Sequence, residues 1–133
     1  MSKKLKKIKN WIENNGYKLK MGNVDQVDYN KFEITINPRQ TKTNLIFSAL
    51  HECGHIILSN KISYNKDFKI INYANKDGRV IRGDVYKYKR LREEIEAWEF
   101  GYKLANTLDI KIDKDEYDSY AAKCFKSYIK FYA

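Results

Sequence analysis

The chain has 133 residues and a mass of 15.8 kDa, the length of one domain, and we expect a single domain over residues 1–133. Hydrophobic residues make up 43% and aromatic residues 14%, which excludes a disordered chain. No apolar run approaches the roughly 20 residues of a membrane span, the lysine-rich start lacks the apolar stretch of a secretory signal, and two cysteines are too few for a disulfide framework. These features predict a cytoplasmic protein without a membrane partner.

The net charge of +9 is unevenly distributed. Residues 1–20 carry seven lysines against one glutamate, a net charge of +6, and residues 61–92 carry ten lysines and arginines against three aspartates, a net charge of +7. Such segments are compatible with nucleic-acid binding. However, Lys outnumbers Arg 21 to 5, whereas base reading and bidentate phosphate binding favour Arg. We therefore interpret the charge mainly as a solvated surface, with nucleic acid as the less favoured partner.

The first third of the chain predicts one helix and three strands. Apolar residues at helical spacing indicate an amphipathic helix over residues 2–14, which Gly16 ends. Short extended segments follow at residues 17–21, 24–29 and 31–37. The last of these alternates apolar and polar residues as a half-buried strand does, and we interpret it as a sheet edge to which an extended peptide can add.

The remainder predicts three helices and one basic insert. The second helix begins after Thr41 or Thr43, ends near Ser59, and is apolar nearly all round, so it should be central and buried.

Residues 60–90 form the insert, in which residues 68–74 and 79–82 are predicted to pair as a hairpin. A third helix is predicted over residues 91–108, acidic at its start. A fourth helix begins at Asp113 or Asp115 and continues to the C-terminus.

The central helix contains a metal-binding pattern of the type His-Glu-x-x-His, formed by His51-Glu52-Cys53-Gly54-His55. Residues four apart on a helix lie on the same face, so the two imidazoles can bind one ion. Zinc suits two neutral imidazoles and a carboxylate, and Glu52 borders the shared face, where it can act as a general base. The alternative is that both histidines are core residues with hydrogen-bond partners and bind no metal. It does not explain why a charged Glu52 is placed on an apolar helix, where burial of a carboxylate costs free energy.

The two central residues of this motif carry expectations of their own. A glycine in the middle of a helix costs about 1 kcal/mol relative to alanine, and a close approach of another backbone at Gly54 would account for it. Cys53 should point away from the histidines as a small core residue. Cys124, on the apolar stripe of the last helix, is interpreted in the same way.

A third metal ligand must be acidic, because the chain has only two histidines. The densest acidic run is residues 93–99, and residues 94–101, Glu-Ile-Glu-Ala-Trp-Glu-Phe-Gly, resemble the Glu-x-x-Ala-(Asn/Asp)-x-Phe-Ala signature of ImmA/IrrE-type zinc metallopeptidases. Residues 34–37 and 50–58 are similar to the strand and active-site helix of the same family. The resemblance covers roughly half of the chain.

The resemblance implies an α+β, zincin-like fold of the gluzincin type, with a small three-stranded sheet packed on the active-site helix and further N-terminal and C-terminal helices. It implies Glu94 as the third ligand beside His51 and His55, with Glu93 and Glu96 as alternatives. The family's supporting Asp or Asn falls on Trp98, whose indole is only a donor. An acceptor for a histidine N–H must then come from Glu93, Glu96 or a backbone carbonyl.

For function, the resemblance implies a peptidase with one Zn²⁺ per chain and Glu52 as general base. The resemblance further implies that the peptidase cleaves an intracellular protein such as a repressor. It also implies that the protein is a small form of the kind that phages and other mobile elements carry. The alternative is a non-catalytic zincin-fold regulatory module that binds protein or nucleic acid through its basic segments. An intact Glu52 counts against it. The substrate, the residue that stabilises the oxyanion and the oligomeric state stay open.

Overall fold

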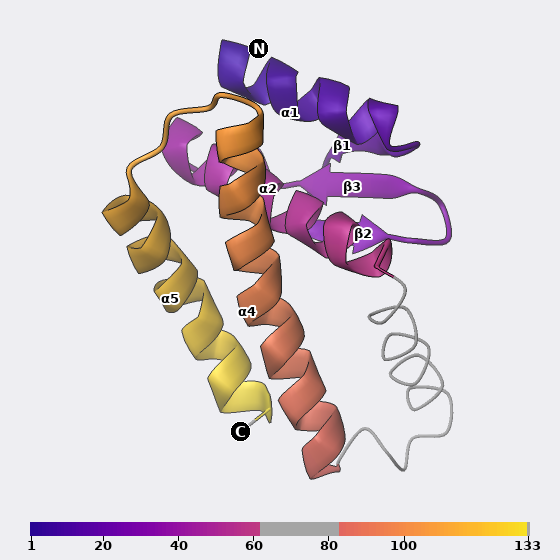
Figure 1. Cartoon of the computed structure of the whole chain (residues 1–133), viewed down its shortest axis with the longest axis vertical. Coiled ribbons are helices and arrows are strands. Elements are labelled where there is room, and N and C mark those ends of the chain that lie inside the picture. The colour runs from indigo at the N-terminus through magenta and orange to yellow at the C-terminus, as the bar shows by residue number, and fades with distance from the viewer. Residues whose placement is uncertain (62–82, 133) are drawn as a thin grey trace.

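The computed structural model describes residues 1–61 and 83–132 and shows an α+β architecture in that part of the chain (Figure 1). α2 packs against the small mixed sheet and α1, α4 crosses α2, and α5 lies beside α4. The predicted α+β class with a small three-stranded sheet is therefore confirmed, the zincin-like fold stays a prediction, and the predicted hairpin lies outside the described residues. The elements are α1 (Lys3–Asn14), β1 (Lys18–Met21), β2 (Gln26–Asp28), β3 (Glu33–Ile36), α2 (Lys42–Ser59), α4 (Asp84–Thr107) and α5 (Lys114–Tyr132).

The sheet has the strand order β1-β3-β2, with β1 parallel and β2 antiparallel to β3. Ile34 and Ile36 of β3 are fully buried, as the alternating pattern predicted. The expectation that this strand is a sheet edge is wrong, because β3 is the central strand, and among the described residues β1 and β2 form the edges. Alternation reports which face of a strand is buried, and it carries no signal about neighbours on either side.

Helix α2 is the centre of the fold. Every residue from Ile46 to Ile56 is buried, and the helix contacts α1, β2, β3, α4 and α5. The Thr41 hydroxyl accepts a hydrogen bond from the Asn44 N–H, which identifies the cap between the two candidates. The prediction of a central, buried helix is confirmed.

Helix α4 begins at Asp84, seven residues before the predicted start at residue 91. Residues 84–90 are rich in lysine and tyrosine and show no clear apolar stripe, so their helical state was not recognised. Asp84 lies in the first turn, where a negative charge interacts favourably with the helix dipole and stabilises the helix. Tyr86 is buried and gives this added length a packing role.

Two glycines allow α2 and α4 to meet closely. A Cβ atom built on Gly54 would lie 1.9 Å from the backbone oxygen of Ala97, and one on Gly101 would lie 2.6 Å from the backbone oxygen of Leu50. Neither position accepts a side chain without a shift of the other helix. The close approach predicted at Gly54 is therefore confirmed, and Ala97 of α4 makes it.

Both cysteines are free thiols. Cys53 is completely buried in the core, as predicted, whereas Cys124 of α5 is only partly buried and packs against that core. Within residues 1–61 and 83–132, no helix combines the length and the apolar character needed to cross a membrane.

Candidate metal centre

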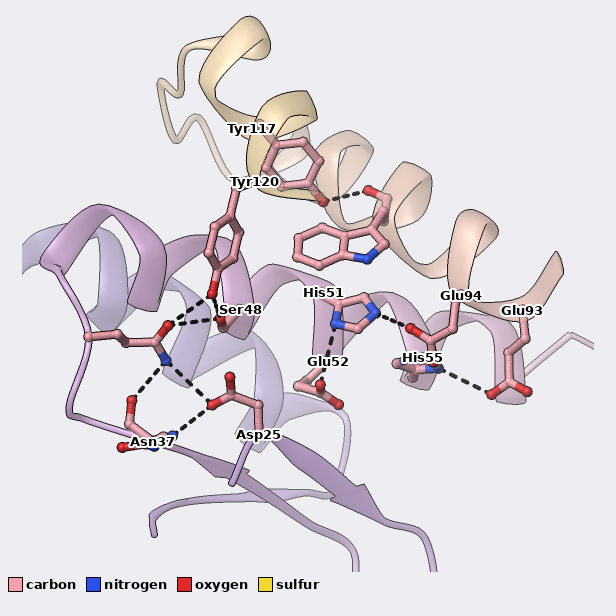
Figure 2. Close-up of polar contacts among 12 residues, drawn as sticks. Asp25, Asn37, Ser48, His51, Glu52, His55, Glu93, Glu94, Tyr117 and Tyr120 are labelled. Atoms are coloured by element: carbon pink, nitrogen blue, oxygen red, sulfur yellow. Dashed lines mark hydrogen bonds and ion pairs between the residues drawn. The ribbon is translucent and has the colours of Figure 1, made fainter. Parts of the chain in front are cut away.

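Helices α2 and α4 bring His51, His55 and Glu94 together (Figure 2). One ligand atom from each lies within 4.8 Å of the other two. His51 Nε2 is 2.9 Å from Glu94 Oε2, and His55 Nε2 is 3.2 Å from Glu94 Oε1. The same nitrogen of both rings therefore faces the same carboxylate. The structure thus gathers the three predicted ligands, and their role as ligands stays a prediction.

The position of Glu94 depends on the tight contact between the two helices. Glu94 lies three residues before Ala97, about one helical turn from the point where Gly54 lets α4 approach. Gly54 itself precedes His55. The small residue in the motif therefore has a direct consequence for the site, because it lets a carboxylate of α4 reach both imidazoles of α2.

The other two acidic candidates, Glu96 and Glu93, do not lie between the two histidines. Glu96 is paired with Arg92 at 3.0 Å on a partly exposed face. Glu93 lies at the opposite nitrogen of His55, with Oε1 3.2 Å from Nδ1, and its Oε2 lies 2.7 Å from Arg90 Nη1. Of the three candidates, Glu94 is the one placed between the histidines, and Glu93 takes the place of an acceptor for a histidine N–H.

Trp98 supports His51 by stacking. The indole and the imidazole are nearly parallel, at an interplanar angle of 7° and a centroid distance of 4.1 Å. The Tyr117 hydroxyl of α5 donates a hydrogen bond to the Trp98 backbone oxygen. The sequence predicted for Trp98 only the loss of an acceptor, and not this stacking. Its spacing of four residues from Glu94 places both on one face of α4, and this was the available signal.

The contacts of His51, His55 and Glu94 favour the charged form of each when no metal is bound. Burial by itself lowers the pKa of His55, but its hydrogen bonds to Glu93 and Glu94 outweigh burial and raise that pKa to about 10. Burial likewise opposes charge on His51, and hydrogen bonds to Glu52 and Glu94 still raise its pKa. Burial acts to raise the pKa of Glu94, and the hydrogen bonds from both histidines bring it well below its ordinary range.

This charge state fits a cation. Glu94 is only 1% exposed, and a buried carboxylate is costly unless a positive charge neutralises it. In the metal-free cluster, a protonated His55 fills that role. A divalent ion would fill it equally well with neutral imidazoles, and two imidazoles with one carboxylate form a donor set that zinc commonly takes, with a further position open.

Glu52 lies beside this cluster at a pocket of about 170 Å³. Its Oε1 is 3.4 Å from His51 Nδ1, and the side chain is buried. The pocket lies between β2, α2, α4 and α5, and its wall includes His55, Glu94, Tyr29 and Tyr128. Sequence reasoning could not select either tyrosine among the chain's eleven, because both come from elements distant in sequence from the motif.

A second polar network anchors α2 one turn before His51. The Gln40 side-chain oxygen accepts hydrogen bonds from Ser48 of α2 and Tyr120 of α5, and its amide donates to the backbone oxygen of Asn37. Asp25 accepts a hydrogen bond from the Asn37 N–H. These contacts join the end of β3, α2 and α5 (Figure 2).

The arrangement of His51, His55 and Glu94 is known from this chain alone. The likeness to ImmA/IrrE-type peptidases stays a prediction that depends on the motifs quoted above. Comparison with family models, with curated proteins and with solved structures found no match to this chain.

Proposed function

We propose that the protein is a zinc-dependent peptidase with a zincin-like fold, which binds one zinc ion per chain and hydrolyses an intracellular protein, such as a regulator or repressor. The observation that carries the proposal is the convergence of His51, His55 and Glu94 from two helices, with Glu52 at the adjoining pocket. A structural metal site has no need of a buried carboxylate at the motif's second position, whereas a hydrolytic site does.

Each residue has a defined task in this proposal. His51 and His55 would hold zinc through Nε2, the nitrogen that faces Glu94 in both rings, and Glu94 would supply the third ligand. When bound, zinc lowers the pKa of a water molecule toward 7 and polarises the scissile carbonyl. Glu52 accepts a proton from the attacking water and delivers it to the leaving amine.

The sheet suggests how a peptide is held. In the part of the chain that the structure describes, β2 is an edge strand, and its residues Gln26 and Val27 line the pocket together with Glu52 and His55. An extended peptide can hydrogen-bond to such an edge as an additional strand. β1 is the other edge of the described sheet and is separated from β2 by β3, so the proposed docking edge is β2 and not β3.

The alternative of a nucleic-acid-binding module has less support. Part of the N-terminal charge has a structural role, because Lys4 and Lys7 of α1 donate hydrogen bonds to the backbone oxygens of Lys111 and Asp109. These contacts join α1 to the segment between α4 and α5. We therefore retain the peptidase as the proposed function.

The test compares wild-type protein with Glu52→Gln. Mass spectrometry of protein purified without added metal should find about one zinc ion per chain in both, since Glu52 is not a ligand. Cleavage of a proteome-derived peptide library, followed as new N-termini, should fall by at least about 100-fold in Glu52→Gln.

The matched control is Glu99→Gln, which neutralises an exposed glutamate of α4 and should cleave as the wild type does. Equal cleavage by wild-type protein and Glu52→Gln would refute the mechanism. Wild-type protein without zinc would refute the metal site.

A further inference from the structure

Glu93 and Glu94 are consecutive residues that contact opposite nitrogens of one imidazole. Glu93 Oε1 is 3.2 Å from His55 Nδ1, and Glu94 Oε1 is 3.2 Å from His55 Nε2. Successive residues of a helix project about 100° apart, so the two carboxylates bracket the ring. His55 is therefore held between two acids of α4, and they have different tasks.

The Nδ1 contact determines which nitrogen is available to a metal. A neutral imidazole that donates its Nδ1–H to a carboxylate presents the lone pair of Nε2, and such outer contacts orient metal-bound histidines and raise their basicity. His55 Nε2 is the nitrogen that lies in the cluster with His51 and Glu94. Glu93 thus acts on the site through His55 and from outside the cluster.

Arg90 keeps Glu93 in this position. Arg90 Nη1 lies 2.7 Å from Glu93 Oε2, the oxygen that does not face His55. Glu93 is only 3% exposed, and an ionised carboxylate at such a site requires a compensating charge. Residues of α4 and α2 therefore form a chain of contacts. Arg90 contacts Glu93, Glu93 contacts His55 of α2, and His55 faces Glu94.

The two histidines differ in this respect. At the position where the resemblance leads one to expect an acceptor for a histidine N–H, the chain has Trp98, and its indole stacks on His51. The residue before Glu94 therefore contacts His55, whereas the residue four positions after Glu94 contacts His51.

We propose that Glu93, held by Arg90, is the positioning residue of the metal centre, which orients His55 with Nε2 toward the ion. This inference rests on the metal site of the proposed function and does not require peptide cleavage. It assigns Glu93 no contact with the ion.

The test measures zinc affinity by competition with a chromophoric chelator at pH 7.5. Glu93→Ala should bind zinc about 10-fold to 100-fold more weakly than wild-type protein, the range found when outer contacts of metal-bound histidines are removed. Glu93→Gln should recover part of the loss, because its amide oxygen still accepts the Nδ1–H. Arg90→Ala should lie between wild-type protein and Glu93→Ala, since Glu93 remains but loses its anchor.

Glu96→Ala is the matched control. Glu96 is also a glutamate of α4 paired with an arginine, Arg92, at 3.0 Å, and it does not contact a histidine in the described structure. Its removal should leave zinc affinity within about twofold of wild type. Circular dichroism of each metal-free variant separates loss of fold from loss of orientation, and Glu93→Gln keeps the test decisive if Glu93→Ala does not fold.

A second readout uses the presence of only two histidines in the chain. Long-range proton–nitrogen NMR spectra of the ¹⁵N-labelled, zinc-loaded protein report the protonated nitrogen of each ring. In wild-type protein, the His55 Nδ1–H should exchange slowly with solvent. In Glu93→Ala it should exchange faster, while the His51 signals remain unchanged.

Two results would overturn the inference. If Glu93→Ala binds zinc as Glu96→Ala does and leaves the His55 signals unchanged, Glu93 does not position the ring. If Glu93→Ala loses zinc as completely as Glu94→Ala, Glu93 is itself a ligand. Wild-type protein that binds zinc and cleaves no peptide refutes the proposed function alone, because the affinity series is measured without a substrate.

Discussion

His51 and His55 lie on one helix, share one carboxylate and have unlike surroundings. His55 lies between Glu93 and Glu94, so both of its nitrogens face acids of α4. His51 faces Glu94 on one side, while its ring is covered by the Trp98 indole. Two acids of α4 restrain the first ring, whereas one acid of α4, the neighbouring Glu52 and a stacked indole restrain the second.

The difference shows how little of the candidate metal centre the His-Glu-x-x-His motif specifies. A spacing of four residues makes two imidazoles converge, but it does not determine what holds each ring in its rotamer. The partner helix does that, through a carboxylate at one histidine and an aromatic face at the other. A stacked indole accepts no hydrogen bond from an N–H in the ring plane, and the acid nearest to His51 Nδ1 is Glu52, at 3.4 Å.

Gly54→Ala should break both sides of the comparison and have the largest effect. The new methyl group would lie 1.9 Å from the Ala97 backbone oxygen, so α4 must move and carry Glu93, Glu94 and Trp98 away from α2. We expect a loss of about 3 kcal/mol or more in the free energy of unfolding, measured by chemical denaturation, and loss of zinc binding. Gly16→Ala is the control.

A Cβ atom on Gly16 meets nothing within 4 Å, and the cost there is that of a backbone with φ of +81°, about 1 kcal/mol. Equal losses for the two variants would show that close contact between α2 and α4 is not required.

The pH dependence of the metal-free protein should separate the two histidines. The folded-state pKa of His55 is raised from 6.5 to about 10, so its stabilisation is complete below pH 6.5 and is lost as the pH rises toward 10. One proton changes stability by up to about 1.4 kcal/mol per pH unit, so the free energy of unfolding should fall by roughly 2 kcal/mol between pH 7 and pH 9. Denaturation in a chelating buffer measures this decline.

Zinc should abolish the decline, because zinc-bound imidazoles are neutral. Glu93→Gln should reduce it, since it removes an acid that raises the pKa of His55, and should leave the part that comes from His51. A metal-free protein whose stability does not change from pH 7 to pH 9 would contradict the ionised cluster.

Trp98→Phe should have the smallest effect and act on the His51 side alone. Phenylalanine retains an aromatic face but leaves a gap, at an expected cost of about 1 kcal/mol in stability. Zinc affinity should fall by less than about tenfold, a smaller change than removal of an outer hydrogen bond produces. Trp11→Phe, at the chain's other tryptophan, is the control and should leave zinc affinity unchanged. A loss as large as that of Glu93→Ala would mean that stacking and hydrogen bonding contribute equally.

The amino-acid sequence was informative wherever a local pattern has a geometric meaning. The alternation of residues 33–36 and the apolar run of α2 predicted their burial. The two histidines four residues apart predicted a shared face, and Gly54 predicted a close backbone approach. Residues 84–90 carry no such pattern, and the start of α4 was therefore missed.

The sequence by itself determined the α+β class, the order of elements, the histidine pair and an acidic partner within residues 93–99. Only the tertiary structure decided that Glu94 meets both imidazoles, that Glu93 contacts the outer nitrogen of His55, that Trp98 stacks on His51 and that β3 is the central strand. Periodicity defines the face of one element, whereas contacts between elements depend on their relative rotation and translation. Between α2 and α4, the close contact of Gly54 with the backbone oxygen of Ala97 fixes the relative rotation and translation of the two helices.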